Sequence, residues 1–203
     1  MKKCLMLFFL MFYSAPSLAE SNGGLIADAS IGSTDLQMTN PDNQISYYKG
    51  YSVHGRGGLP LLEGTSNLYL TLNIGVTDAY NTANTNTQSE YVNFLYPGIG
   101  LFYKMSRLGL GFDYNFMFTR HRTVGTISRE TNYSFNSIGY WAQYIFPLGN
   151  RSSLGLAYSG QSGTISKSQI KLSQDMPYSS STFWIFFTYY SGIQLGELLG
   201  LGK

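Results

Sequence analysis

The sequence predicts an all-β chain that forms an eight-stranded antiparallel up-and-down transmembrane β-barrel. Apolar residues recur at every second position in eight separate segments. Charged residues make up 12% of the chain and aromatic residues 16%. Soluble domains average about 25% charged residues, which they need to cover their surface. The composition therefore favours a sheet whose outer face meets lipid.

Residues 1–19 have the features of an export signal. Two lysines precede the apolar run 5–12, which is too short to act as a membrane-spanning anchor, and small residues lead up to Ala19. We expect cleavage after Ala19 and a single barrel domain over 20–203. The only cysteine, Cys4, precedes the apolar run, whereas a lipoprotein signal would carry it afterwards. The domain therefore needs no disulfide, as expected for a bacterial cell-envelope protein.

The charge balance excludes one large class of partner. The chain has 13 Lys and Arg against 11 Asp and Glu, and two of the lysines belong to the export signal. No basic stripe suggests a nucleic-acid partner. Two histidines, with no cysteine in 20–203, make a transition-metal site improbable, and we expect no cofactor.

Four strands are predicted in the first half of the domain. Segment 25–34 alternates only weakly, because alanines occupy two of its apolar positions. Segment 45–56 sets Tyr, Ile and Val against Ser, Gly, His and Arg. Segment 67–77 is the most regular, with Leu, Ile or Val at every second position. Segment 94–104 alternates apolar residues with glycines.

The second half of the domain supplies four more predicted strands. Segment 108–119, LGLGFDYNFMFT, carries its bulky side chains on one face. Segment 137–146 alternates in the same way, 153–160 is shorter, and 181–194 is rich in aromatic rings. These lengths suit the roughly 9–11 residues of a tilted membrane strand.

The connections alternate in length. The odd connections, 35–44, 78–91, 120–130 and 167–180, are long and polar. Two even connections are short, whereas 57–66 is longer. Long loops at one end and tight turns at the other describe an outer-membrane barrel with both chain ends in the periplasm. Ten strands remain possible if 57–66 or the C-terminal tail adds a hairpin.

The bulky face is expected to point outward, because a full set of rings would crowd the narrow interior of an eight-stranded barrel. Small and polar residues would fill that interior instead. A soluble exported lipocalin-like binding barrel, with the rings inside, is the alternative. The side chains expected to face lipid on 108–119 are Leu108, Leu110, Phe112, Tyr114, Phe116 and Phe118.

A polar network is expected inside the barrel, packed and not a wide pore. Buried charges need partners, so we predict cross-strand pairs between Asp28 and Arg56 and between Lys104 and Asp113. Strand parity also turns Trp141 inward, although tryptophan is expected at a membrane rim. The predicted network comprises Asp28, His54, Arg56, Asn73, Lys104, Asp113, Asn115 and Gln143.

This architecture resembles the small eight-stranded barrels of Gram-negative bacteria, such as the OmpA transmembrane domain and the OmpX/Ail group. The segment QLGELLGL at 194–201 is similar in spacing to their C-terminal assembly signal, but it lacks the aromatic last residue. The resemblance implies contact with outer-membrane lipid, with lipopolysaccharide and, during biogenesis, with the barrel-assembly machinery. It also implies a structural or loop-mediated role in envelope integrity or in adhesion to an extracellular or host ligand.

The connection 120–130 holds the candidate site residues. His121, Ser128 and Glu130 are the inventory of a hydrolase, and a lipid A-modifying hydrolase or acyltransferase is an alternative function. No motif fixes their geometry, so we expect no enzyme. Three arginines, Arg120, Arg122 and Arg129, are candidates for holding lipopolysaccharide phosphates through charge-assisted hydrogen bonds. A solvated polar loop is the simpler interpretation.

Overall fold

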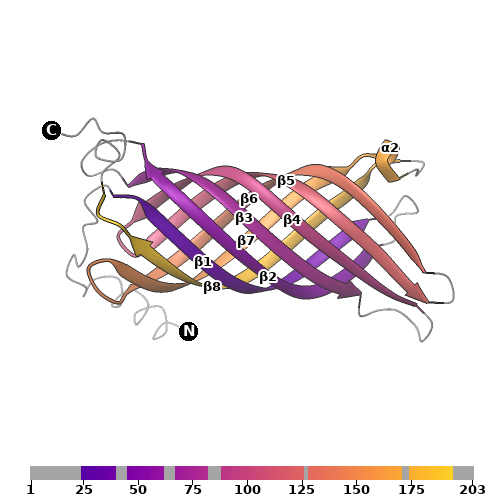
Figure 1. Cartoon of the computed structure of the whole chain (residues 1–203), viewed down its shortest axis with the longest axis horizontal. Helices are drawn as coiled ribbons and strands as arrows, with labels where there is room; N and C mark the ends of the chain where they lie inside the picture. The colour runs from indigo at the N-terminus through magenta and orange to yellow at the C-terminus, as the bar shows by residue number, and fades with distance from the viewer. Residues whose placement is uncertain are drawn as a thin grey trace, which may run out of the picture.

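The computed structural model describes residues 24–39, 45–61, 67–81, 88–125, 128–170 and 174–193, which form one closed antiparallel barrel (Figure 1). Each strand pairs with its neighbours in the sequence, and β1 closes the ring against β8. The elements are β1 (Ile26–Thr39), β2 (Ile45–Pro60), β3 (Leu68–Asn81), β4 (Gln88–Met105), β5 (Leu108–Gly125), β6 (Arg129–Pro147), β7 (Ser152–Ile165), α2 (Lys167–Ile170) and β8 (Met176–Tyr190).

The eight-stranded prediction is confirmed, and the ten-stranded alternative is wrong, because β1 already pairs with β2 on one side and β8 on the other. The expected export signal 1–19 and the segment 194–201 lie outside the described residues. Within the described ranges no helix has the length and apolar character needed to cross a membrane.

The two ends of the barrel differ. The start of β1 and the finish of β8 lie together, since Ile26 pairs with Tyr190 (Figure 1). We call this the turn end, because β4 and β5 are joined there by the two-residue turn at Ser106 and Arg107, with Ser106 at a φ of 50°. The opposite end, which carries α2, is the loop end.

The strands extend much further toward the loop end than the sequence suggested. Each of the expected loops 35–44, 78–91, 120–130 and 167–180 has at least five residues in a strand. β5 has 18 residues, which at roughly 3.3 Å per residue and a tilt of roughly 40° gives about 45 Å along the barrel axis. A membrane's apolar band needs only about 25 Å. At β5 about 20 Å of wall therefore extends beyond such a band, whereas the 14-residue strands β1, β3 and β7 extend about 10 Å beyond it.

The outward face is divided accordingly. Its turn-end part is apolar, and the six bulky side chains of β5 that were expected outward are all exposed, from 38% for Leu108 to 52% for Phe118. Its loop-end part carries polar residues on every side, among exposed apolar and aromatic ones such as Ile45, Tyr80 and Val124. Exposed outward residues there include Ser33, Asp35, Gln37, Lys49, Asp78, Ser89, Arg120, Arg122, Glu130 and Asn132.

At the loop end, where the outward face becomes polar, the inward face carries large apolar side chains, and this change explains why the strand ends were taken for loops. On β6, Tyr133 and Phe135 point inward, whereas Ile138 and Tyr140 point outward. The apolar set thus changes face within a single strand. In the sequence, the apolar residues therefore stop recurring at the same parity partway along the strand. The residues beyond that point, whose outward side chains are polar, resemble a loop.

The barrel interior has an apolar layer at each end. The turn-end layer comprises Ile26, Tyr69, Phe102, Trp141 and Tyr190. The larger loop-end layer includes Leu36, Met38, Tyr48, Val92, Phe94, Tyr96, Met117, Tyr133, Phe135 and Tyr178. The expectation of a mostly small and polar interior is therefore wrong at both ends.

Glycines make room for these inward rings. Gly111 pairs with Trp141 across β5 and β6, and Gly75 pairs with Tyr96 across β3 and β4. A Cβ atom on either glycine would collide with the ring opposite. Each of these rings therefore packs against a glycine of the neighbouring strand, which has no side chain at that point. This packing leaves space for many rings inside an eight-stranded barrel.

A polar layer separates the two apolar ones. Thr34 lies 2.6 Å from Ser52 and 2.9 Å from Thr182, measured between hydroxyl oxygens, and Ser52 lies 2.6 Å from Thr77. This chain of hydroxyl hydrogen bonds links β8, β1, β2 and β3 at mid-height. Its members satisfy one another, as buried polar groups must.

Candidate functional site

The eight residues of the expected interior network all lie on the inward face of the barrel. His54 is half-buried and the others are buried. They come from the first six strands, so the network is assembled by barrel closure and not by any local motif.

Arg56 is the centre of the turn-end half of this network. It pairs in register with Asp28, and its guanidinium contacts that carboxylate directly. Its Nη2 also donates to Gln143 Oε1 at 3.3 Å. The guanidinium carbon lies 3.7 Å from the centre of the Trp141 ring and 4.9 Å from that of Phe102. A carboxylate, an amide and two π faces thus compensate one buried cation.

The expected pair of Lys104 and Asp113 does not form. The turn sets Met105 opposite Leu108, so Lys104 faces Gly109 and Asp113 faces Gly100. Four residues along the strand separate the two, which is about 13 Å. The Lys104 ammonium instead lies 4.4 Å from the centre of the Tyr190 ring. Lys104 and Asp113 flank the same turn, but their positions in the strand register keep the two charges apart.

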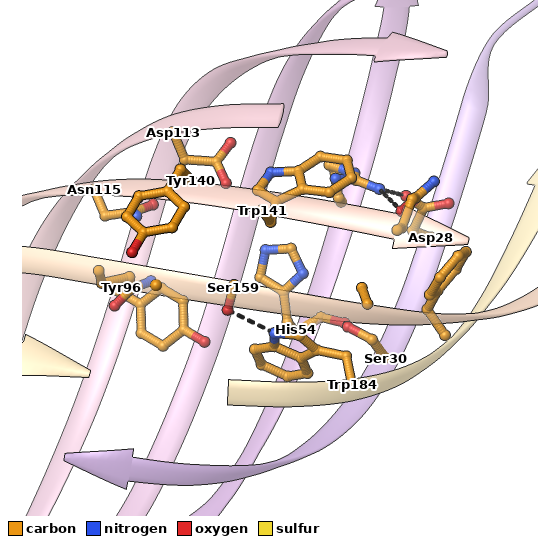
Figure 2. A pocket seen from close by; sticks show the side chains of 17 residues that line it. Asp28, Ser30, His54, Tyr96, Asp113, Asn115, Tyr140, Trp141, Ser159 and Trp184 are labelled. Carbon is orange, nitrogen blue, oxygen red and sulfur yellow. Dashed lines mark hydrogen bonds and ion pairs between the residues drawn. The ribbon is translucent and has the colours of Figure 1, made fainter. Parts of the chain in front are cut away.

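A small cavity lies in the middle of the barrel. Its volume is about 50 Å³, and its lining includes His54, Asp113 and Trp184. Figure 2 shows the His54 ring between the side chains of Trp141 and Trp184. Trp184 Nε1 donates to Ser159 Oγ at 2.8 Å. Roughly 10–15 Å³ is needed per water molecule, so this cavity has room for a few waters but not for an organic ligand. Both tryptophans face inward, so the strand parity was right for Trp141.

At the loop end, strand alternation separates the residues of the hydrolase inventory. His121 faces inward, where its Nε2 lies 3.8 Å from Glu90 Oε2. Glu130 faces outward, where its Oε2 accepts a hydrogen bond from Arg120 at 2.7 Å. Ser128 is exposed just before β6. The structure therefore does not bring His121 and Glu130 together.

The carboxylate partner of His121 was missed by sequence reasoning. Tyr48 donates its hydroxyl to Glu90 Oε2 at 2.7 Å, and the rings of Tyr48 and His121 meet edge to face. Glu90 fell in the expected loop 78–91, so no parity was assigned to it. The His121 ring, followed by the Tyr48 hydroxyl, holds the pKa of Glu90 well below its usual range, at about 2. Burial raises the pKa of Tyr48, and so does the hydrogen bond to Glu90.

The three arginines do not form one loop cluster. Arg120 and Arg122 point outward from β5, and Arg129 begins β6 opposite Thr123. Glu130 compensates part of their charge, because it pairs with Arg120 and sits opposite Arg122 in the register. In the part of the chain that the structure describes, no three His, Cys, Asp or Glu side chains are grouped to hold a metal ion.

Comparison with known proteins identifies the fold. No protein-family model matches the chain, and no curated protein matches it. Among solved structures, Ail, the attachment invasion locus protein of Yersinia pestis, is similar with a TM-score of 0.55 and 9% identity, over 82% of this chain and 99% of that one. The fold is that of a small outer-membrane β-barrel. Ail in complex with the heparin analogue sucrose octasulfate matches over the same shares, with a TM-score of 0.51 and 11% identity.

Replacing Arg56 by Met is expected to destabilise the barrel by about 3–5 kcal/mol, because Asp28 would remain buried without its partner. Adding Asp28→Asn should recover part of that loss, since no bare charge then remains. Equilibrium urea unfolding of the refolded protein measures both variants. Equal stability of Arg56→Met and the parent chain would contradict the proposed role of the pair.

The lowered pKa of Glu90 predicts acid sensitivity confined to the loop end. The ionised carboxylate stabilises the fold fully above its ordinary pKa of 4.5, and this contribution is lost as the pH falls toward about 2. His121→Ala should raise the pKa of Glu90 and move the loss to higher pH. Carboxyl titration by NMR measures the shift. Arg120→Ala is the control: if it moved the Glu90 titration as far as His121→Ala, the assigned cause would be wrong.

Proposed function

We propose that the chain is exported, loses residues 1–19 and resides in the bacterial outer membrane, where its role is structural and interactive. The observation that carries this proposal is the outward apolar band of a closed barrel. Soluble barrels keep such residues inside, and an outward face of Phe, Leu and Ile suits hydrocarbon. The same face argues against a soluble lipocalin-like barrel.

The packed interior argues against conduction as the main role. Apolar layers flank a central cavity of about 50 Å³, whereas open channels need wider barrels. A lipid A-modifying enzyme is the weaker candidate, because His121 and Glu130 face opposite sides of the wall and His121 lies beside Glu90 instead.

Contact with lipopolysaccharide is the finer part of the proposal. The loop-end wall would stand among the head groups of the outer leaflet, and Arg120 and Arg122 point sideways into that zone from β5. Guanidinium groups bind phosphate oxygens through paired, charge-assisted hydrogen bonds. Arg129 would add a third cation at the rim. A role in adhesion is supported by the heparin-analogue complex of the similar Ail barrel, with the loop end of this chain as the surface concerned.

Fractionation of a Gram-negative host tests the location. We expect the protein in outer membranes, with gel mobility that changes on boiling and with Glu20 as the first residue. Phe112→Arg should cost about 2–4 kcal/mol and impair assembly, because Phe112 lies in the middle of the apolar band. Thr164→Arg, outward on β7 beyond the band, is the matched control and should assemble normally. Recovery of the parent protein from the soluble periplasm would exclude the proposal.

Replacing Arg120, Arg122 and Arg129 together by Ala should lower the amount of lipopolysaccharide that copurifies with the barrel, because three phosphate donors are lost. Quantifying bound lipid by phosphate analysis measures the change. Arg107 and Arg151 lie at the turn end, so their replacement serves as the control for lost positive charge. Equal lipid retention by the parent chain and the triple variant would contradict the assigned contact.

A further inference from the structure

A groove with a distinct chemistry crosses the loop-end wall over β8, β1 and β2. It has a volume of about 450 Å³. Its outward side chains form two cross-strand rows: Ser181, Asp35 and Lys49 in one, and Ser179, Gln37 and Tyr47 in the other. We call these six residues the lateral groove. We propose that it binds the saccharide part of the glycolipid in the surrounding outer leaflet, a step that rests on the membrane location proposed above.

The size of the lateral groove suits one or two sugar rings. Adjacent strands lie about 4.8 Å apart, and rows two residues apart are separated by about 6.7 Å. Two rows over three strands therefore present a grid of roughly 10 by 7 Å. Every position of that grid carries a group that forms hydrogen bonds, and each group comes from a rigid strand and not from a loop.

The chemistry of the six side chains matches a polyhydroxylated ligand. The Asp35 carboxylate only accepts hydrogen bonds, the Lys49 ammonium only donates, and the Gln37 amide and both serine hydroxyls do both. The Tyr47 ring, 49% exposed, offers an apolar face beside a polar hydroxyl, which suits the alternating C–H and O–H surface of a sugar. One acid and one base leave the groove neutral, so a polyanion gains no attraction there.

The position of the groove selects the source of the sugar. On the outward face of β1, the residues next to Asp35 on the side of the turn end are Ser33 and then Ile31. On β8, the outward residue next to Ser181 in that direction is Phe183. The groove thus begins about 7 to 14 Å from the apolar band, counting two to four residues along a strand. It opens sideways from the wall. In a membrane this direction faces the sugars of neighbouring glycolipids, whereas a soluble ligand approaches from the loop end.

The lateral groove and the outward arginines of β5 are separate surfaces that would contact different glycolipid molecules, one through sugar and the other through phosphate. Arg120 and Arg122 lie on β5, across the barrel from β1 in the strand order. Phosphate groups lie at the inner part of a glycolipid head group and sugars further out. The neutral lateral groove is therefore a different surface from the phosphate contact, and its test must vary the sugar while the phosphates stay constant.

Binding of two purified probes tests the proposal. One probe is lipopolysaccharide with a complete core oligosaccharide, and the other is lipid A alone, which keeps the phosphates. Native mass spectrometry of the detergent-solubilised barrel counts the bound molecules. We expect the parent chain to retain the first probe several-fold better, and Tyr47→Ala with Gln37→Ala to bring that ratio close to one.

A matched double variant on another part of the wall tests whether removing any exposed tyrosine and amide side chain would abolish the preference for the complete glycolipid. Tyr91 is an outward tyrosine on β4 that is 42% exposed, and Asn136 is an exposed outward amide on β6. Tyr91→Ala with Asn136→Ala removes the same groups from the other wall and should keep the preference. Equal retention of both probes by the parent chain, or loss of the preference in this control, would overturn the proposal.

Core oligosaccharide released from its lipid separates the two sources of sugar. We expect it to compete poorly, because the lipid part of the intact glycolipid associates with the apolar band and holds its sugar beside the sideways-facing groove, whereas the released oligosaccharide has no such anchor. Competition as strong as that of the intact glycolipid would show that the occupant is a free glycan, and the membrane source would be wrong. Fractionation and boiling-dependent mobility of the Tyr47→Ala, Gln37→Ala variant report separately on the membrane location.

Discussion

One constraint shapes the whole barrel: each strand crosses two environments and must place its apolar residues on opposite faces in the two. In the proposed outer-membrane location, the outward face along the apolar band meets a medium in which polar groups are costly. Beyond the band that face would meet water and head groups, and the inward face would be the place that shelters apolar side chains. On β6 the change falls between Phe135, which is inward, and Ile138, which is outward. The loop-end apolar layer exists because of this change, and it gives the projecting wall a core of its own.

Closure into eight strands sets the second condition, which is a narrow interior of fixed width. The chain fills it with rings laid over glycines, as at Trp141 over Gly111, and with one stacked cation, Arg56. Such an interior is specific and dense, but it leaves no room for a ligand. Functional chemistry is therefore expected on the outer surfaces, where the wall extends past the band and side chains are free to meet partners.

The sequence predicted features that depend on parity alone. Counting by two was enough to predict the number of strands, the outward-facing set of β5 and the facing positions of Asp28 and Arg56. Features that depend on strand length or on turn geometry could not be predicted from the sequence. The two-residue turn at Ser106 moves Lys104 away from Asp113, and the extension of β5 and β6 puts His121 and Glu130 on opposite faces. Glu90 escaped notice for the same reason, since its strand was taken for a loop.

The extended wall also changes where specificity is expected. Loops usually carry recognition in barrels of this kind, but here long stretches of the expected loops are strand, and their side chains point sideways. A strand fixes the backbone spacing of its side chains, so the neutral grid on β8, β1 and β2 and the arginines on β5 need no backbone ordering on binding, and only side-chain freedom is lost. In the proposed membrane location, their direction favours ligands that share the membrane plane. The geometry therefore favours a protein that organises its neighbouring lipids through its sides, with the loop end left free for other partners.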